Sequence, residues 1–283
     1  MSKSGVVLLH GAWHDHHTWD SVVPILESAG VATRAIDLPG AGKSAKVPES
    51  YKVRPIDLAA FSTEPSPNAG VTQDERTAAT IAAVRDVNKE TGGKAVVLGH
   101  SLGGLTVSTA VEEIPDEVSA AVYLCAFLAA PGLLAGEMIA HPSMAASKVP
   151  PLFLADPEQV GALRIDPASE DAAYNEQARQ AFYADLTDAQ VAEAKSHLHP
   201  DEPAQVSGVP SPISKARFGT VARHYIECVN DQATPIESQR TMVALADEAM
   251  GNKTIVHTMT TSHSPFHSAP QDLAQIILSI AGD

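Results

Sequence analysis

Short apolar runs alternate with helical patterns over the first 130 residues of the chain. The runs lie at Gly5–Gly11, Val31–Leu38, Lys94–Gly99 and Ala120–Phe127. A continuous apolar run of this length is typical of a parallel strand buried on both faces, because half-exposed strands alternate polar and apolar residues. Strands of this kind separated by helices predict an α/β fold with a mostly parallel sheet flanked by helices.

Helix signals stand between these runs. Thr72 and Glu75 match a Thr-x-x-Glu capping box, in which each side chain binds the other residue's backbone N–H, so a helix is expected to start there. A glycine, Gly30, ends the helix expected after the first run. The helices predicted in this part are Trp19–Ala29, Thr72–Asn88 and Leu102–Glu112.

The strand–helix rhythm stops after the first 130 residues and returns later. Between Pro131 and Pro212 strand-like runs are missing, and helical patterns lie at Ala168–Ala184 and Asp188–His197. We therefore expect residues 1–129 and 215–283 to form one α/β core, with a helical cap inserted at 130–214. In the second part of the core, strands and helices are predicted at Ala222–Val229, Ser238–Met250, Lys253–Met259 and Gln271–Ala281. Residues 41–70 are expected to form a long functional or mobile loop.

The charge balance limits the partners. With 34 acidic against 19 basic residues the formal net charge is -15, which argues against nucleic acid or an anionic membrane surface as a partner.

No segment has the apolar length needed to span a bilayer, and the N-terminus lacks the apolar stretch of a signal peptide, so we expect a cytoplasmic protein. Cys125 and Cys228 are expected to be buried, reduced thiols. The sequence leaves a homodimer open.

The segment Gly99-His100-Ser101-Leu102-Gly103 matches G-x-S-x-G. It follows the apolar run that ends at Gly99 and precedes the helix predicted from Leu102, which is the strand–turn–helix setting in which this motif carries a nucleophile. The tight turn would hold the serine in a strained conformation, with its hydroxyl projecting above the sheet. We therefore predict that Ser101 is the nucleophile of a hydrolase.

A serine hydroxyl needs a positioned base, for which histidine is suited. In the chain order Ser, acid, His, the base follows the last strand, where His263 is favoured over His267. The acid should follow the preceding strand, where Asp231 is favoured over Glu227, and it would hold the imidazole in one tautomer. His257, inside the last strand, is expected to be structural.

Two backbone N–H groups should bind the oxyanion of the transition state. One is that of Leu102, directly after the nucleophile, and the other is assigned to Ala12 in the loop after the first strand. The loop continues as His14-Asp15-His16-His17, which is expected to line the mouth of the pocket. Neither its spacing nor that of His197 and His199 fits a catalytic metal site, so no metal and no cofactor are expected.

Four segments together give the chain a family resemblance: HGAWH, GHSLGG, YIECVNDQATPIESQR and SHSPFHSAP. The chain resembles the branch of the α/β-hydrolases that contains plant methyl esterases, hydroxynitrile lyases and bacterial esterases similar to pyrethroid hydrolases. In that branch the acid stands six residues before the Glu of an E-x-Q motif, here Glu237, which implies Asp231. The base is the His before S-P-F, which implies His263.

The resemblance also bears on the reaction type. Hydroxynitrile lyases of this branch have a Thr directly after the first-strand His and a Lys directly after the catalytic His, where this chain has Gly11 and Ser264. We therefore expect hydrolysis of a small to medium hydrophobic carboxylic ester through an acyl-enzyme. Lyase, lactonase or perhydrolase activity in the same site, or a slow-turnover ligand receptor, are the alternatives. The residues expected to line the substrate pocket are Gly11, Trp13, Phe153, Leu154, Phe182 and Tyr183.

Overall fold

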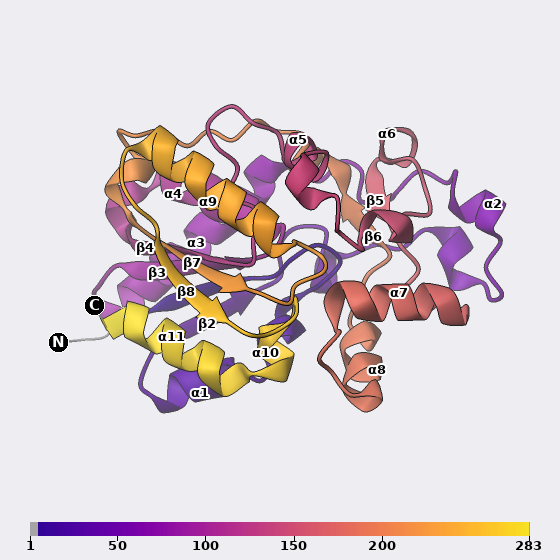
Figure 1. The fold of residues 1–283 in the computed structure, drawn as a ribbon, viewed down its shortest axis with the longest axis horizontal. Coiled ribbons are helices and arrows are strands. Elements are labelled where there is room, and N and C mark those ends of the chain that lie inside the picture. The colour runs from indigo at the N-terminus through magenta and orange to yellow at the C-terminus, as the bar shows by residue number, and fades with distance from the viewer. Residues whose placement is uncertain (1–4, 283) are drawn as a thin grey trace.

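A six-stranded parallel sheet forms the centre of the computed structural model, which describes residues 5–282 (Figure 1). The strand order is β2-β1-β3-β4-β7-β8, and every neighbouring pair is parallel. This confirms the sheet predicted from the apolar runs. The strands are β1 (Val6–Leu9), β2 (Thr33–Ile36), β3 (Ala95–His100), β4 (Val118–Leu124), β7 (Ala222–Cys228) and β8 (Ile255–Met259).

Helices cover both faces of this sheet. Successive residues of a strand point to opposite faces, so each strand contributes side chains to both helical layers. Val7 and Val97 pack with the helices of one face, whereas their neighbours Val6 and Val96 pack with those of the other. The first face is covered by α3 (Gln73–Thr91), α4 (Gly103–Glu113) and α9 (Ile236–Met250), and the second by α1 (Val23–Ser28) and α11 (Pro270–Gly282). The inner strands β1, β3 and β4 are thus buried on both sides, whereas the edge strand β8 exposes Ile255 and Val256.

The start of α3 agrees with its sequence signal. Thr72 accepts a hydrogen bond from the Glu75 N–H at 3.2 Å, and the Glu75 carboxylate accepts the Thr72 N–H at 2.8 Å, which completes the capping box. The helix runs on to Thr91, beyond the predicted end at Asn88, and stops at Gly92, whose φ of 68° lies in the left-handed region.

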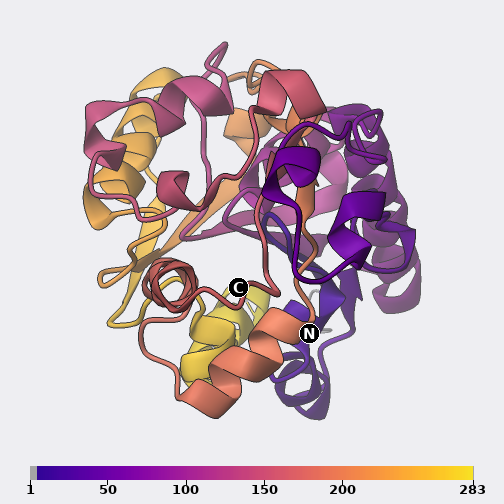
Figure 2. The ribbon, with the colours of Figure 1, turned by 90° about the vertical axis from the view of Figure 1, so that its right-hand side faces the viewer.

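The segment between β4 and β7 lies beyond one end of the sheet, on the right of Figure 1 and nearest the viewer in Figure 2. We call this segment the cap. Its two longest helices coincide with the predicted helical patterns. It contains α5 (Ala135–Ile139), α6 (Pro157–Val160), α7 (Ala172–Phe182) and α8 (Asp188–Ser196), and also a small antiparallel sheet of β5 (Ala162–Arg164) and β6 (Asp201–Pro203).

The small sheet is a departure from the expectation that the cap lacks strands. Its three-residue strands, Ala-Leu-Arg and Asp-Glu-Pro, carry no alternating apolar pattern. Buried ion pairs join them to each other and to the core instead. Arg164 and Asp201, both fully buried, join the two strands at 2.7 Å, and Glu202 pairs with Arg76 of α3 at 2.5 Å. Such pairing depends on partners far apart in the sequence and cannot be read from local propensity.

The segment 41–70 is more ordered than the loop that was expected. It contains short helical turns, η2 (Gly42–Ser44), η3 (Glu49–Lys52) and α2 (Leu58–Phe61). The Asn68 side chain binds the backbone of Lys46, and the Ser66 N–H donates to the carbonyl of Val160 in the cap. This segment therefore packs against the cap.

Among residues 5–282, no helix is both long and apolar enough to cross a membrane. Residues 1–4, part of the N-terminal stretch considered above for a signal peptide, and residue 283 lie outside the described residues.

Candidate active site

Ser101 lies on the tight turn between β3 and α4, in a strained conformation. Its φ of 51° falls in the left-handed region, which residues other than glycine seldom adopt. Three hydrogen bonds fix the turn: the Ser101 N–H donates to Leu124 O at 3.1 Å, and the Ser101 carbonyl accepts from the N–H groups of Gly104 and Phe127. The side chain is half-buried and lines a pocket.

Two glycines make this turn possible. A Cβ at Gly103 would lie 2.4 Å from the carbonyl oxygen of His10, and a Cβ at Gly11 would lie 2.8 Å from Cβ of Ser101. Both separations are shorter than real carbon contacts. The loop after β1 can therefore approach the serine only because these positions lack side chains.

His263 and Asp231 form a buried pair after β8 and β7. The His263 Nδ1–H donates to Oδ2 of Asp231 at 2.7 Å, and the two residues are 1% and 5% exposed. The other carboxylate oxygen, Oδ1, accepts the N–H groups of Ala233 and Thr234 at 2.7 and 2.9 Å. This pairing leaves Nε2 of His263 as the nitrogen available to accept a proton.

The backbone of His263 is held as well as its ring. Its carbonyl oxygen accepts from Nε2 of His100 at 2.9 Å and from the Cys125 thiol at 3.5 Å. Burial, and the nearby His263, keep the pKa of His100 well below its usual value, so this ring stays neutral. Burial likewise raises the pKa of the Cys125 thiol. Cys125 and Cys228 are both free and buried, as expected.

Ala12 and Leu102, whose backbone N–H groups are predicted to bind the oxyanion, line the same pocket as Ser101 and His263. Neither N–H has a hydrogen-bond acceptor within the described part of the chain, although both residues are more than 90% buried. Leu102 directly precedes α4, whose N-terminus favours negative charge. The two donors could therefore receive an oxyanion formed at Ser101.

Two neutral histidines fix the loop that carries Ala12. Nε2 of His10 accepts the Leu38 N–H, so its Nδ1–H donates to Gly11 O at 2.8 Å. The Nδ1–H of His14 donates to Ala12 O at 2.7 Å. Burial lowers the pKa of His10 to about 4 and that of His14 to about 3, which keeps both rings uncharged at neutral pH.

The pocket above Ser101 is small and apolar, with a cavity volume of about 50 Å³. Of the residues predicted to line it, Trp13, Phe153 and Phe182 do so. Trp13 lies 6.2 Å from Phe153 and 5.8 Å from Phe182 between ring centroids. The wall also contains residues that were not predicted from the sequence, because most of them lie in short elements and loops of the cap: Phe127, Ile139, Met144, Ser147, Val149, Pro150, Leu163, Ala233 and Thr234.

The other three predicted pocket residues lie elsewhere. Leu154 lines a separate pocket beside Arg54 and Tyr174, because its backbone N–H is bound to Arg164 O in the small sheet. Tyr183 is fully buried, and its hydroxyl donates to Nε2 of His14 at 3.0 Å. Gly11 packs under Ser101 rather than against the cavity. Leu154 and its neighbour Phe153 therefore line different pockets.

The alternatives to the acid and the base have other contacts. Glu227 binds Arg240 at 2.9 Å and the Thr258 hydroxyl at 3.0 Å. His257 pairs with His224 across β7 and β8 at 3.1 Å. His267 faces a different pocket, and burial lowers its pKa to about 4.

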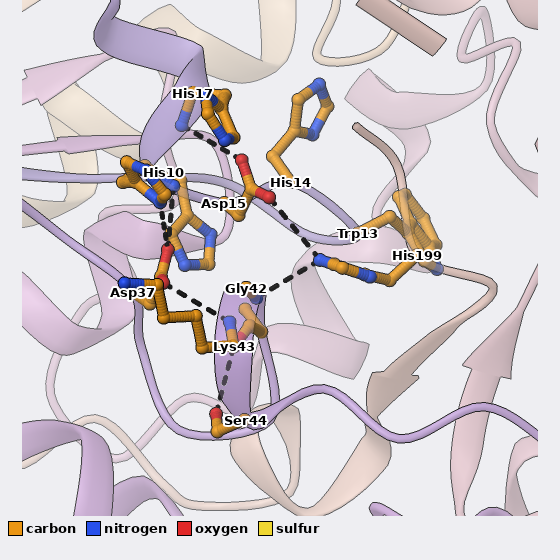
Figure 3. A network of polar contacts seen from close by, with 12 residues as sticks. His10, Trp13, His14, Asp15, His17, Asp37, Gly42, Lys43, Ser44 and His199 are labelled. Carbon is orange, nitrogen blue, oxygen red and sulfur yellow. Dashed lines mark hydrogen bonds and ion pairs between the residues drawn. The ribbon is translucent and has the colours of Figure 1, made fainter. Parts of the chain in front are cut away.

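The polar loop after Ala12 forms its own network rather than lining the mouth of the active-site pocket (Figure 3). His16 pairs with Asp37 at 2.7 Å, His17 with Asp20 at 2.8 Å, and Asp15 with His199 at 3.6 Å. Asp15, His16 and His17 bring one potential metal ligand each to within 4.8 Å of one another. Nδ1 of both histidines is already engaged by a carboxylate.

Comparisons with known proteins give a consistent result. Residues 6–276 match a family model described as the alpha/beta hydrolase family. A pyrethroid hydrolase of Sphingobium wenxiniae is 28% identical over 285 residues, which cover 99% of this chain and 89% of that protein. Methylesterase 1 of Arabidopsis thaliana is 24% identical over 298 residues, which cover 99% of this chain and 96% of the relative. A crystal structure of the pyrethroid hydrolase PytH has a TM-score of 0.77 at 26% identity and covers 99% of this chain and 97% of that chain. The similarity therefore spans the core and the cap alike.

Proposed function

The chain belongs to the alpha/beta hydrolase family, and we propose that it is a serine esterase that cleaves small to medium hydrophobic carboxylic esters through an acyl-enzyme. One observation carries this proposal most directly. The strained Ser101 and His263, which is paired with the buried Asp231, line one apolar pocket together with Ala12 and Leu102, whose backbone N–H groups have no acceptor in the described part of the chain. Relatives over the full length of the chain are named as a pyrethroid hydrolase and as methylesterases, which supports ester chemistry.

In the proposed reaction, Nε2 of His263 takes the proton of Ser101 as Oγ attacks the ester carbonyl carbon. The new Oγ–C bond moves an electron pair onto the carbonyl oxygen, and the N–H groups of Ala12 and Leu102 bind the resulting oxyanion. When the tetrahedral adduct collapses, the imidazolium gives its proton to the leaving alcohol, and the acyl group stays on Ser101. His263 then deprotonates a water, whose attack releases the acid and returns the proton to Ser101.

Asp231 acts through His263. Its negative charge stabilises the imidazolium that forms in each half-reaction, and its hydrogen bond holds the proton on Nδ1. The N–H groups of Ala233 and Thr234 keep the carboxylate in place. Desolvation strengthens the pair, because both residues are almost completely buried.

The apolar lining of the pocket favours uncharged substrates. Apart from His263, none of the side chains that line it is ionisable, and Trp13, Phe153 and Phe182 form an aromatic wall. A charged acyl or alcohol group would lose its hydration there without gaining a partner, so we expect neutral, apolar esters. A cavity of about 50 Å³ is far below the roughly 300–1,000 Å³ of pockets that hold drug-sized ligands, so bulkier esters require the cap to move outward.

The proposal is tested with esters that vary the acyl and the alcohol part separately, measured on the wild type and on Ser101→Ala. We expect turnover of neutral esters by the wild type and a loss of at least about 10³-fold in the variant. Mandelonitrile is measured alongside, and cleavage of it faster than of any ester would replace the esterase proposal by a lyase. Esterase activity that survives in Ser101→Ala would refute the role of the serine.

A further inference from the structure

Trp13, in the loop after β1, makes three hydrogen bonds to the cap. The Trp13 carbonyl accepts the His199 N–H at 2.8 Å, and the indole Nε1–H donates to Leu163 O at 2.8 Å. The Trp13 N–H donates to Oε2 of Glu202 at 3.3 Å. Trp13 has a φ of 62°, and a residue other than glycine keeps such a conformation only where its surroundings determine it.

Glu202 is itself held by a buried ion pair. Its Oε1 accepts from Nη1 of Arg76 at 2.5 Å, and both side chains are only 2% exposed. Arg76 lies on α3, and its Nε–H donates to Pro39 O at 3.0 Å, so the core fixes its position. The two oxygens of Glu202 are therefore divided between the core helix and the Trp13 N–H.

Trp13 directly follows Ala12, the proposed oxyanion donor, and both peptide groups around Ala12 are fixed. The preceding peptide is held at its oxygen, Gly11 O, by His10. The following peptide is held at its oxygen by His14 and at its N–H by Glu202. Of these three contacts, only the one from Glu202 comes from the cap, so it joins the orientation of the oxyanion loop to the docking of the cap.

We propose that Glu202 is a positioning residue for the oxyanion hole. Glu202 orients the Ala12 N–H through its hydrogen bond with the Trp13 N–H, and Arg76 fixes the carboxylate of Glu202. The proposal rests on the proposed function, because it requires the Ala12 N–H to receive the oxyanion. A carboxylate suits this role because it accepts from both donors at once. An amide in the same place presents an oxygen to one donor and an NH₂ group to the other.

The first variant is therefore Glu202→Gln. The charged Arg76 takes the amide oxygen, and the NH₂ group then faces the Trp13 N–H, so the loop loses its acceptor. We expect kcat to fall about 10- to 100-fold with KM changed by less than about 2-fold, because a misplaced oxyanion donor weakens the transition state and not the bound ester. The affinity of a trifluoromethyl ketone that adds to Ser101 should fall by the same factor as kcat/KM.

Asp201→Asn is the matched control, one residue earlier on the same strand. It removes the negative charge that Arg164 binds through both oxygens at 2.7 Å in an equally buried site, and Asp201 has no hydrogen bond or ion pair to the loop of Trp13. We expect a comparable fall in Tm for the two variants. Only Glu202→Gln should lose kcat and trifluoromethyl ketone affinity.

The double variant Arg76→Met/Glu202→Met separates positioning from stability. It removes both buried charges together, which proteins often tolerate, but still leaves the Trp13 N–H without an acceptor. We expect a folded protein with the same loss of kcat as Glu202→Gln. A double variant with wild-type kcat and wild-type trifluoromethyl ketone affinity overturns the proposal. Ser101→Ala distinguishes this outcome from failure of the proposed function: if that variant is inactive, the esterase assignment stands and only the role of Glu202 is wrong.

Discussion

Oδ2 of Asp231 lies 2.7 Å from Nδ1 of His263, and the second oxygen of the same carboxylate is held by two backbone N–H groups. These contacts fix both the position of the carboxylate and the tautomer of the imidazole. Asp231 is thereby prevented from turning away when His263 takes up a proton.

Asp231→Asn should remove most of the activity while keeping the fold. Its amide oxygen can retain the N–H groups of Ala233 and Thr234, so the NH₂ group faces Nδ1 of His263 and forces the proton onto Nε2. We expect kcat to fall on the order of 10³- to 10⁴-fold. Glu227→Gln is the control, because Glu227 binds Arg240 away from the pocket, and it should keep wild-type kcat. Equal losses in the two variants would point to Glu227 as the acid or to a general effect on folding.

Acid should destabilise the protein through its buried neutral histidines. The pKa of His10 is about 4 in the folded chain against 6.5 for an ordinary histidine, so the unfolded state binds more protons between these values. Stability is therefore complete above about pH 6.5 and is lost as the pH falls toward 4, by about 3 kcal/mol from His10 alone. His14, with a pKa of about 3, adds to the loss in the same direction. Urea unfolding at pH 7.5, 5.5 and 4.5 measures this, and an unchanged free energy of unfolding would show that the histidines are not buried as described.

Gly103→Ala should disrupt the turn under Ser101. The added Cβ would meet His10 O at 2.4 Å, so either β1 or α4 must shift. We expect loss of activity and a drop in stability of about 1–3 kcal/mol, the size typical of overpacked cores. Gly136→Ala is the control, because its Cβ would have no neighbour within 4 Å, and it should change stability by less than about 1 kcal/mol. Normal activity in Gly103→Ala would contradict the close packing of the turn.

Substitution of two neighbouring cap residues, Phe153 and Leu154, should differ in its effect on the preference for esters of different size. Phe153 lines the pocket above Ser101, whereas Leu154 lines a separate one. Phe153→Ala should raise kcat/KM for bulky acyl groups relative to acetyl esters about 10-fold, as expected for the space of a few methylenes. Leu154→Ala should leave that ratio unchanged. A shift with Leu154→Ala alone would place the substrate in the other pocket.

Phe153 and Leu154 were both predicted to line the substrate pocket, but only Phe153 does so. The strands, the turn at Ser101 and the order of Asp231 and His263 were predictable because apolar runs, glycines and chain order are local signals. The pocket lining of the cap was predictable only in part, since it comes from several short elements whose burial depends on tertiary packing. Likewise β6 has no strand pattern. The proposed positioning role of Glu202 depends on its contacts with Arg76 and Trp13, which lie far from it in the sequence.

The central claim is that Ser101 carries the acyl group during turnover. It is tested most directly by mixing the protein with excess of a p-nitrophenyl ester that is hydrolysed slowly, quenching in acid, and locating the added acyl mass by peptide mass spectrometry. We predict a burst of one p-nitrophenol per chain and an acyl group on Ser101, with neither in Ser101→Ala. An acyl group on another residue, or wild-type turnover with no acylated Ser101 under conditions that trap the intermediate, would contradict the account.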